Sequence, residues 1–265
     1  MRRLPVLFGL GLALFATPLF AQAPPLEHFQ CYAVRQATPN VVVPLGLRDQ
    51  FSATGAAEQV DAVRALKFCN PVGKFHRNQF FPVVDIRQHL TFYATFPQSA
   101  PLRVVTLSNQ FDRTAAQPQV WIVREPVAIA VPTHKPPHDK PAGLDHFRCY
   151  VAHATGALTP EVVGLVDQFL PFGGRLVLHP ALFCNPVQKT RLDTGEVTPI
   201  QNPDAHLACY TTTRVPFTGT RDVDNQFGAQ VLVFGPPDTL CVPTRKLAFT
   251  TIPDAPIGGA GDIGQ

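Results

Sequence analysis

The chain has 265 residues, of which 45% are hydrophobic and 15% are charged. The hydrophobic share is large enough to fill a core and excludes a disordered chain, while 28 prolines and 18 glycines interrupt the sequence too often for long helices. The formal net charge of +3 is carried by scattered arginines, which excludes the strongly basic surface with which proteins bind nucleic acid.

The N-terminus has the pattern of a secretory signal peptide. Two arginines precede an apolar run over residues 4–20, and small residues follow it. The run is short and two prolines interrupt it, which makes it a poor membrane span. We predict a signal peptide over residues 1–21, cleaved after Ala21, and a secreted or periplasmic protein with no membrane span in the mature chain. An uncleaved N-terminal anchor is the alternative.

Three short motifs then recur in the same order, with a period of about 60 residues. The first contains a histidine and, four residues later, a tyrosine; it lies at residues 27–32, 88–93, 145–150 and 205–210. The second reads Asp/Asn-Gln-Phe and lies at residues 49–51, 109–111, 167–169 and 225–227. The third reads Cys-x-Pro-x-x-Lys at residues 69–74, 184–189 and 241–246, and Ala-Val-Pro-x-x-Lys at 130–135. These motifs define four units, over residues 27–74, 88–135, 145–189 and 205–246.

The second unit indicates how the six cysteines pair. Six cysteines in an exported chain predict disulfides, and spacing alone leaves 15 possible pairings. The second unit has Phe92 and Ala130 where the other units have cysteines. Because bonded partners would be lost together, we predict one disulfide within each of the other units, with Phe92 and Ala130 filling the same space by apolar contact. The predicted pairs are Cys31–Cys69, Cys149–Cys184 and Cys209–Cys241.

The segments between these motifs indicate short strands. Apolar stretches rich in β-branched or aromatic residues, bounded by Pro, Gly, Asn or Asp, lie at residues 29–34, 102–107, 120–124, 147–152, 176–178 and 231–234. Residues 56–66 have the apolar spacing of a helix. However, the other three units have Pro126, Pro180 and Pro237 at the matching place, where proline would break a helix. We therefore predict strands there too, and an all-β fold.

A proline-rich stretch at residues 136–144 lies near the middle of the chain and is typical of a stiff linker. It predicts two similar small β domains, sandwich or barrel in type, over residues 25–135 and 145–247, each built from two units. A single ring of four units, like a small propeller, is the alternative. The glycine-rich end of the chain predicts a disordered tail over residues 248–265.

Each unit also repeats a histidine, a tyrosine and a lysine, and these are the candidate binding residues. They are His28, His89, His146, His206, Tyr32, Tyr93, Tyr150, Tyr210, Lys74, Lys135, Lys189 and Lys246. We favour a structural role for them, because a catalytic site seldom needs four copies. The alternative is a hydrolase or lyase in which His, Tyr and Lys from facing units act as acid, base and electrostatic stabiliser. Alternation along the first strand predicts that its His and Tyr lie on the wetter face, and its Cys on the buried face.

The motifs of haem attachment, zinc proteases and nucleophile elbows are absent from the sequence. The His-x-x-Cys spacing suits a metal, but the second unit keeps His89 and lacks both cysteines, which favours disulfides. We predict no catalytic residue, metal or cofactor. The interpretation is an exported, disulfide-stabilised module with a binding or structural role, whose partner is an unknown extracellular or periplasmic ligand or protein.

Taken together, Asp-His-Phe-x-Cys-Tyr, Asp/Asn-Gln-Phe and Cys-Asn-Pro-x-x-Lys resemble the motifs of an uncharacterised family of secreted bacterial repeat proteins, a domain of unknown function. The resemblance covers most of residues 27–246, and the second unit departs from it by lacking both cysteines. It implies export and repetition, and it implies no activity and no catalytic residue.

Overall fold

The computed structural model describes residues 26–253, apart from 38–41, 53–55, 97–99, 113, 115–116 and 157. The predicted signal peptide, residues 1–21, lies outside the described residues. Within the described residues, no helix is long and apolar enough to cross a membrane.

The described chain consists of β-strands, which confirms the all-β prediction. The first unit contains β1 (Phe29–Gln36), β2 (Val43–Arg48) and β3 (Glu58–Pro71), followed by β4 (Gly73–His76) and β5 (Gln79–Phe81). The second contains β6 (Leu90–Thr95), β7 (Arg103–Ser108) and β8 (Gln119–Pro132). The third contains β9 (Phe147–Ala154), β10 (Glu161–Val166) and β11 (Gly173–Pro186), followed by β12 (Gln188–Arg191) and β13 (Val197–Thr198). The fourth contains β14 (His206–Thr212), β15 (Gly219–Asn225) and β16 (Gly228–Thr251).

Every unit has the same three-strand pattern. The first strand pairs with the C-terminal part of the long third strand, and the second strand pairs with its N-terminal part. Between these two parts the pairing of each third strand with the next unit shifts register, at Ala65, Pro126, Pro180 and Pro237. Such an irregularity bends a strand, and it tolerates proline because the ladder is interrupted there. The prolines that argue against a helix thus mark the bend of a strand.

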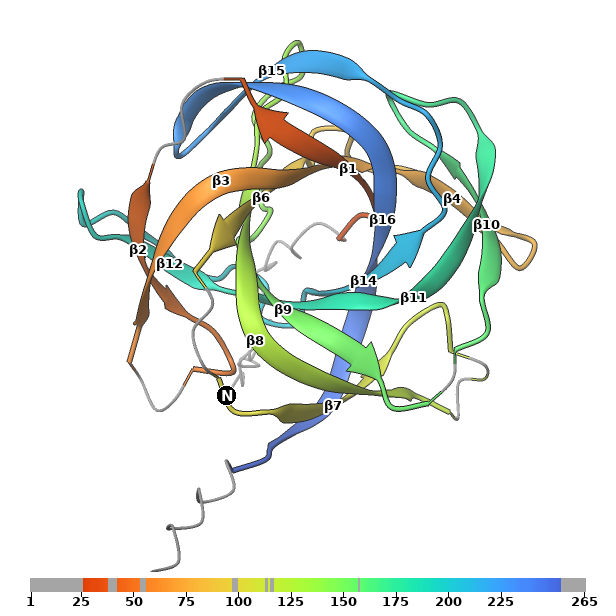
Figure 1. Cartoon of the computed structure of the whole chain (residues 1–265), viewed down its shortest axis with the longest axis horizontal. Helices are drawn as coiled ribbons and strands as arrows, with labels where there is room; N and C mark the ends of the chain where they lie inside the picture. The colour runs from red at the N-terminus through yellow and green to blue at the C-terminus, as the bar shows by residue number, and fades with distance from the viewer. Residues whose placement is uncertain are drawn as a thin grey trace, which may run out of the picture.

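The four units join edge to edge in a closed ring. Each third strand also pairs with the first strand of the following unit, through β3–β6, β8–β9, β11–β14 and finally β16–β1. Figure 1 shows these eight strands around the centre of the molecule. The pairings correspond to the four-unit ring that was the alternative prediction. A boundary at residues 136–144 would separate β8 from β9, which are hydrogen-bonded to each other. The ring also differs from a propeller, because its strands are paired all the way round.

A second layer covers the outside of the ring. The segment that follows each third strand pairs with the middle strand of the unit opposite, through β4–β10, β12–β2 and the end of β16 with β7. In the second unit a single bridge joins His134 to Asp224 of β15. In Figure 1, β2 with β12, β15, β10 with β4, and β7 form four lobes outside the ring. Each unit is therefore held by its two neighbours in the ring and by the unit opposite.

The end of the chain corrects one prediction. Residues 248–265 were expected to form a disordered tail, but Ala248–Thr251 continue β16 and pair with Arg103–Thr106 of β7. The rest of the predicted tail, from residue 254 on, lies outside the described residues. The prediction failed because this segment finds its partner in the unit opposite, which local sequence cannot reveal.

The three disulfides are the pairs that the repeats predict: Cys31–Cys69, Cys149–Cys184 and Cys209–Cys241. Each joins directly opposed residues of neighbouring strands inside the ring. They close 38, 35 and 32 residues, and each should stabilise the fold by about 3–4 kcal/mol. Phe92 and Ala130 oppose each other in the same way in the second unit. Both are buried in the cluster that contains all six cysteines.

We expect a fourth disulfide to form in the double variant Phe92→Cys/Ala130→Cys, because these residues have the register of the three natural pairs. Loss of the phenyl ring costs about 3–5 kcal/mol and the new bond returns about 3–4 kcal/mol. The free energy of unfolding of the double variant should therefore lie within about 2 kcal/mol of that of the parent chain. Phe92→Cys alone should be much less stable. Mass spectrometry without reductant checks the bond; two free thiols in the folded double variant would contradict the register.

Candidate functional site

The repeated histidines and lysines lie between neighbouring units. His28 and Lys74 of the first unit lie beside the Gln-Phe pair of the second unit. The His28 ring lies near the Gln110 side chain, and Lys74 Nζ is 5.3 Å from the centre of the Phe111 ring. The same lysine-to-ring contact recurs around the ring: Lys135 to Phe169 at 5.0 Å, Lys189 to Phe227 at 5.9 Å and Lys246 to Phe51 at 4.9 Å. A cation–π contact thus joins each unit to the next.

Burial changes the charge states of these groups. Burial, and then the positive charge of Lys74, lowers the pKa of His28 to about 4. In the other units burial and the unit's own lysine lower the histidine pKa to about 3, at His89, His146 and His206. Burial also lowers the pKa of the four lysines, Lys74, Lys135, Lys189 and Lys246, to about 8. The histidines are therefore neutral at neutral pH, and a neutral imidazole beside the lysine avoids a second buried positive charge.

The repeated tyrosines reach the unit opposite. Tyr32 donates a hydrogen bond to Asp167 Oδ2 at 2.8 Å, and Tyr150 donates one to Asp49 Oδ2 at 2.8 Å. In the other two units the hydroxyl accepts instead: Tyr210 from Asn109 at 2.9 Å, and Tyr93 from Asn225 at 2.7 Å. Each Asp or Asn also accepts the backbone N–H of the phenylalanine two residues later, which closes a tight turn. The Asp/Asn-Gln-Phe motif is therefore a turn that docks onto the tyrosine opposite.

These contacts exist in two forms that alternate around the ring. Asp49 and Asp167 accept from the amides of Asn185 and Asn70 in the unit opposite. Asn109 and Asn225 instead donate to the hydroxyls of Thr244 and Thr133. An acceptor thus faces a donor in every unit. The third motif differs accordingly: it contains Asn-Pro-Val in the first and third units and Val-Pro-Thr in the second and fourth.

The prediction that the His and Tyr of the first strand lie on a wetter face is wrong. His28, Gln30 and Tyr32 are only 7%, 2% and 0% exposed. The reason is the outer layer, which covers the side of the ring that faces away from the disulfides. The histidines and lysines lie between neighbours and the tyrosines between opposite units, so the twelve residues do not gather in one cleft.

One pocket does gather residues from all four units. It has a volume of about 320 Å³ and lies at one end of the ring, and we call it the mouth pocket. It is lined by Leu66, Lys67, Phe92, Val127, Ala128, Ala181, Leu182, Thr211, Thr212, Arg214, Asp238 and Thr239. Phe92 and Ala128 belong to the cluster that surrounds the disulfides, so this cluster forms the floor. Where β1 and β9 begin, the opposite end of the cluster is occupied by Leu26 and Leu144.

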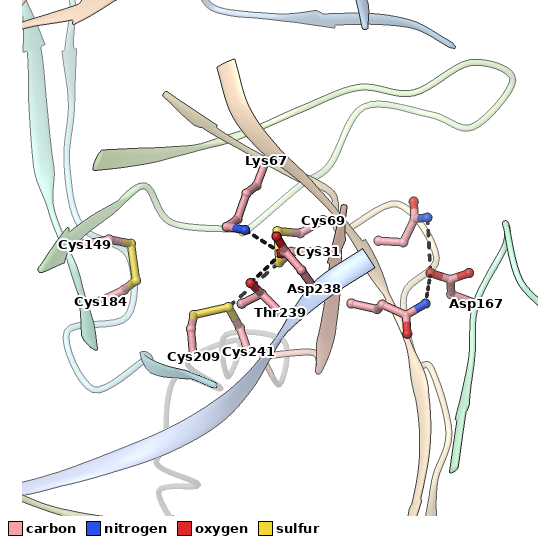
Figure 2. Close-up of a disulfide and its surroundings, with 12 residues drawn as sticks. Cys31, Lys67, Cys69, Cys149, Asp167, Cys184, Cys209, Asp238, Thr239 and Cys241 are labelled. Atoms are coloured by element: carbon pink, nitrogen blue, oxygen red, sulfur yellow. Dashed lines mark hydrogen bonds and ion pairs between the residues drawn. A yellow bond between two sulfur atoms is a disulfide. The ribbon is translucent and has the colours of Figure 1, made fainter. Parts of the chain in front are cut away.

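One side of the mouth pocket is charged. Lys67 Nζ lies 2.5 Å from Asp238 Oδ1, and Arg214 Nη2 lies 3.6 Å from Asp238 Oδ2. Thr239 Oγ1 also donates to Asp238 Oδ1 at 2.8 Å. Figure 2 shows Lys67 pointing toward Asp238, beside the Cys31–Cys69 and Cys209–Cys241 disulfides. The side chains of Lys67 and Asp238 are 23% and 15% exposed, and that of Arg214 is 71% exposed.

Sequence reasoning missed the mouth pocket because it followed the residues that repeat. The pocket is lined by the residues two and three places before the third motif of each unit, which are Leu66-Lys67, Val127-Ala128, Ala181-Leu182 and Asp238-Thr239. These pairs differ in every unit. A search for matching positions that differ in chemistry could have found them.

A second cavity of about 390 Å³ lies outside the ring, beside Arg77, Glu161 and Tyr210. Of the described residues that line it, Glu161 alone has a carboxylate, which is paired with His76 at 2.5 Å and with Arg77 at 2.6 Å. These pairs hold β4 against β10. Neither cavity is lined by a repeated histidine or lysine.

Comparison of the chain with family models, curated proteins and solved structures finds no match. The resemblance to a family of secreted repeat proteins therefore stays a prediction.

Proposed function

We propose that the chain is an exported, disulfide-stabilised binding module that holds a small ligand in the mouth pocket. The observation that carries this proposal is the convergence of all four units on one pocket with an apolar floor. Its volume of about 320 Å³ is within the usual range of small-molecule sites, about 300–1,000 Å³. Export is supported by the signal-peptide pattern, by three disulfides, which persist in oxidising compartments, and by the resemblance to secreted repeat proteins.

A binding role is favoured over the enzyme alternative by the positions of the repeated residues. A hydrolase or lyase built from them needs His, Tyr and Lys within reach of one substrate. Here each histidine lies close enough to its own unit's lysine for the lysine charge to lower its pKa, while each tyrosine hydroxyl is hydrogen-bonded to the opposite unit. The repeated set therefore supports the ring, and the ligand site is sought where the units differ.

Fluorescence of phenylnaphthylamine, a neutral apolar probe, tests the proposal. We expect saturable binding by the parent chain. Ala181→Phe should weaken binding at least about tenfold, because Ala181 is half-buried in the pocket wall and the added ring would fill the pocket. The matched control is Ala229→Phe, on an exposed site at the start of β16, which should bind as the parent does.

Both variants are first shown to be folded by their unfolding temperatures. Full affinity in Ala181→Phe, or absence of saturable binding of both this probe and its sulfonated analogue by the parent chain, would contradict a ligand site in the mouth pocket.

A further inference from the structure

The charged side of the mouth pocket is not required by the fold. The second and third units build the same bend with Val127-Ala128 and Ala181-Leu182, which are apolar. At the matching places the first and fourth units have Lys67 and Asp238. Partial burial of two charges costs desolvation free energy that apolar residues would avoid. Two units thus build this bend without charged residues, so the bend itself does not require Lys67 or Asp238.

The charges divide the pocket into two halves. The first and fourth units are neighbours through β16–β1, and they supply Lys67, Arg214 and Asp238. The second and third units are neighbours through β8–β9, and they supply Phe92, Val127, Ala128, Ala181 and Leu182. A ligand that fills the pocket would therefore contact apolar side chains on one half and charged groups on the other.

The charged half has an excess of positive charge. Lys67 and Arg214 share one carboxylate, that of Asp238. Lys67 makes the direct contact at 2.5 Å, while Arg214 is 3.6 Å away and largely exposed. Among the described residues Arg214 has no other ion pair, so most of its five N–H donors are available to a ligand. A planar guanidinium binds carboxylate, sulfonate or phosphate groups through two parallel hydrogen bonds.

We propose that the mouth pocket takes a small amphiphilic anion. Its apolar body lies against Phe92 and Leu182, and its anionic group binds Arg214 with Lys67 beside it. This inference rests on the proposed binding function and names the chemical class of its ligand. A cationic ligand is disfavoured because two cations already face Asp238, the only carboxylate among the described residues that line the pocket.

Two probes that differ by a single sulfonate test the class. Anilinonaphthalene sulfonate is phenylnaphthylamine with one anionic group added. We expect the parent chain to bind the sulfonate at least about tenfold more tightly than the neutral probe, and salt to reduce this preference because Arg214 is exposed. Arg214→Gln should abolish the preference while leaving affinity for the neutral probe within about twofold.

Two further variants refine the test. Asp238→Asn should increase the preference for the sulfonate, because it removes the carboxylate that competes for both cations. Arg245→Gln is the matched control; this exposed arginine lies on the part of β16 that pairs with β7, and its loss should leave the preference unchanged.

The outcomes separate the two proposals. Equal binding of both probes by the parent chain, or an unchanged preference in Arg214→Gln, would overturn the anion inference and leave the binding function standing. Binding of neither probe would overturn the binding function itself.

Discussion

Between about pH 7 and about pH 5, protonation of the four repeated histidines in the unfolded chain should lower the free energy of unfolding by about 8 kcal/mol, which is as much as the whole stability of many domains. The four repeated histidines have a pKa of about 3 or 4 in the folded chain, below the ordinary 6.5, because they are buried beside lysines. The unfolded chain therefore binds more protons as the pH falls below 6.5. Stability is present above that pH and is lost toward the folded pKa, at about 2 kcal/mol per histidine by about pH 5.

Two buried carboxyls, Glu27 and Asp145, have a raised pKa and offset part of this loss at the acid end. Urea unfolding followed by fluorescence of Trp121, the single tryptophan and fully buried, measures the effect. His89→Gln should reduce the loss between the two pH values by about 2 kcal/mol. His153→Gln, at an exposed site, is the control and should leave it unchanged. Equal stability of the parent chain at both pH values would contradict the buried neutral histidines.

The second large effect is expected for Asp49→Ala. Asp49 accepts hydrogen bonds from Tyr150 at 2.8 Å and Asn185 at 3.3 Å, and it closes the turn through the backbone N–H of Phe51. Alanine leaves the buried hydroxyl and amide without an acceptor. We expect a loss of about 3–6 kcal/mol, since each hydrogen bond to a charged group contributes about 1.5–3 kcal/mol. Chemical denaturation measures the change, and Asp222→Ala at an exposed site should cost little.

The alternation around the ring offers a sharper test of the same contact. Asp49→Asn alone keeps the turn but places its amide against the amide of Asn185, so it should also destabilise. Adding Asn185→Val and Val187→Thr reproduces the arrangement of Asn109 with Thr244. The triple variant should recover part of the loss. A triple variant less stable than Asp49→Asn would show that the two forms are not interchangeable.

Much of the fold follows from comparing the four units with one another. The paired loss of two cysteines in the second unit indicates the bonds that the other units form, and the prolines at the bend exclude a helix at residues 56–66. What the sequence does not reveal is which unit lies against which. The segments that follow each third strand pair with the unit opposite, and the paired residues Lys74 and Leu165 are more than 80 residues apart in the chain. No local pattern specifies such a partner, which explains the misplaced tail and the two-domain prediction.

The candidate site, in contrast to the fold, could not be predicted from the residues that repeat. The repeated His, Tyr and Lys side chains are conspicuous because every unit must make the same contacts with its neighbours. The residues of the mouth pocket make no contact that every unit must repeat, so they can differ from unit to unit. Lys67 and Asp238 therefore look ordinary in the sequence, and only the closed ring brings them to one pocket.

We propose that the repeated residues hold the ring together while a ligand occupies the mouth pocket. Backbone amide chemical shifts of the isotope-labelled chain, titrated with anilinonaphthalene sulfonate, test it most directly. We predict that the largest changes occur at Leu66, Ala181, Thr211 and Asp238, around the mouth pocket. Largest changes at the repeated histidines and lysines, with the pocket amides unmoved, would contradict the account.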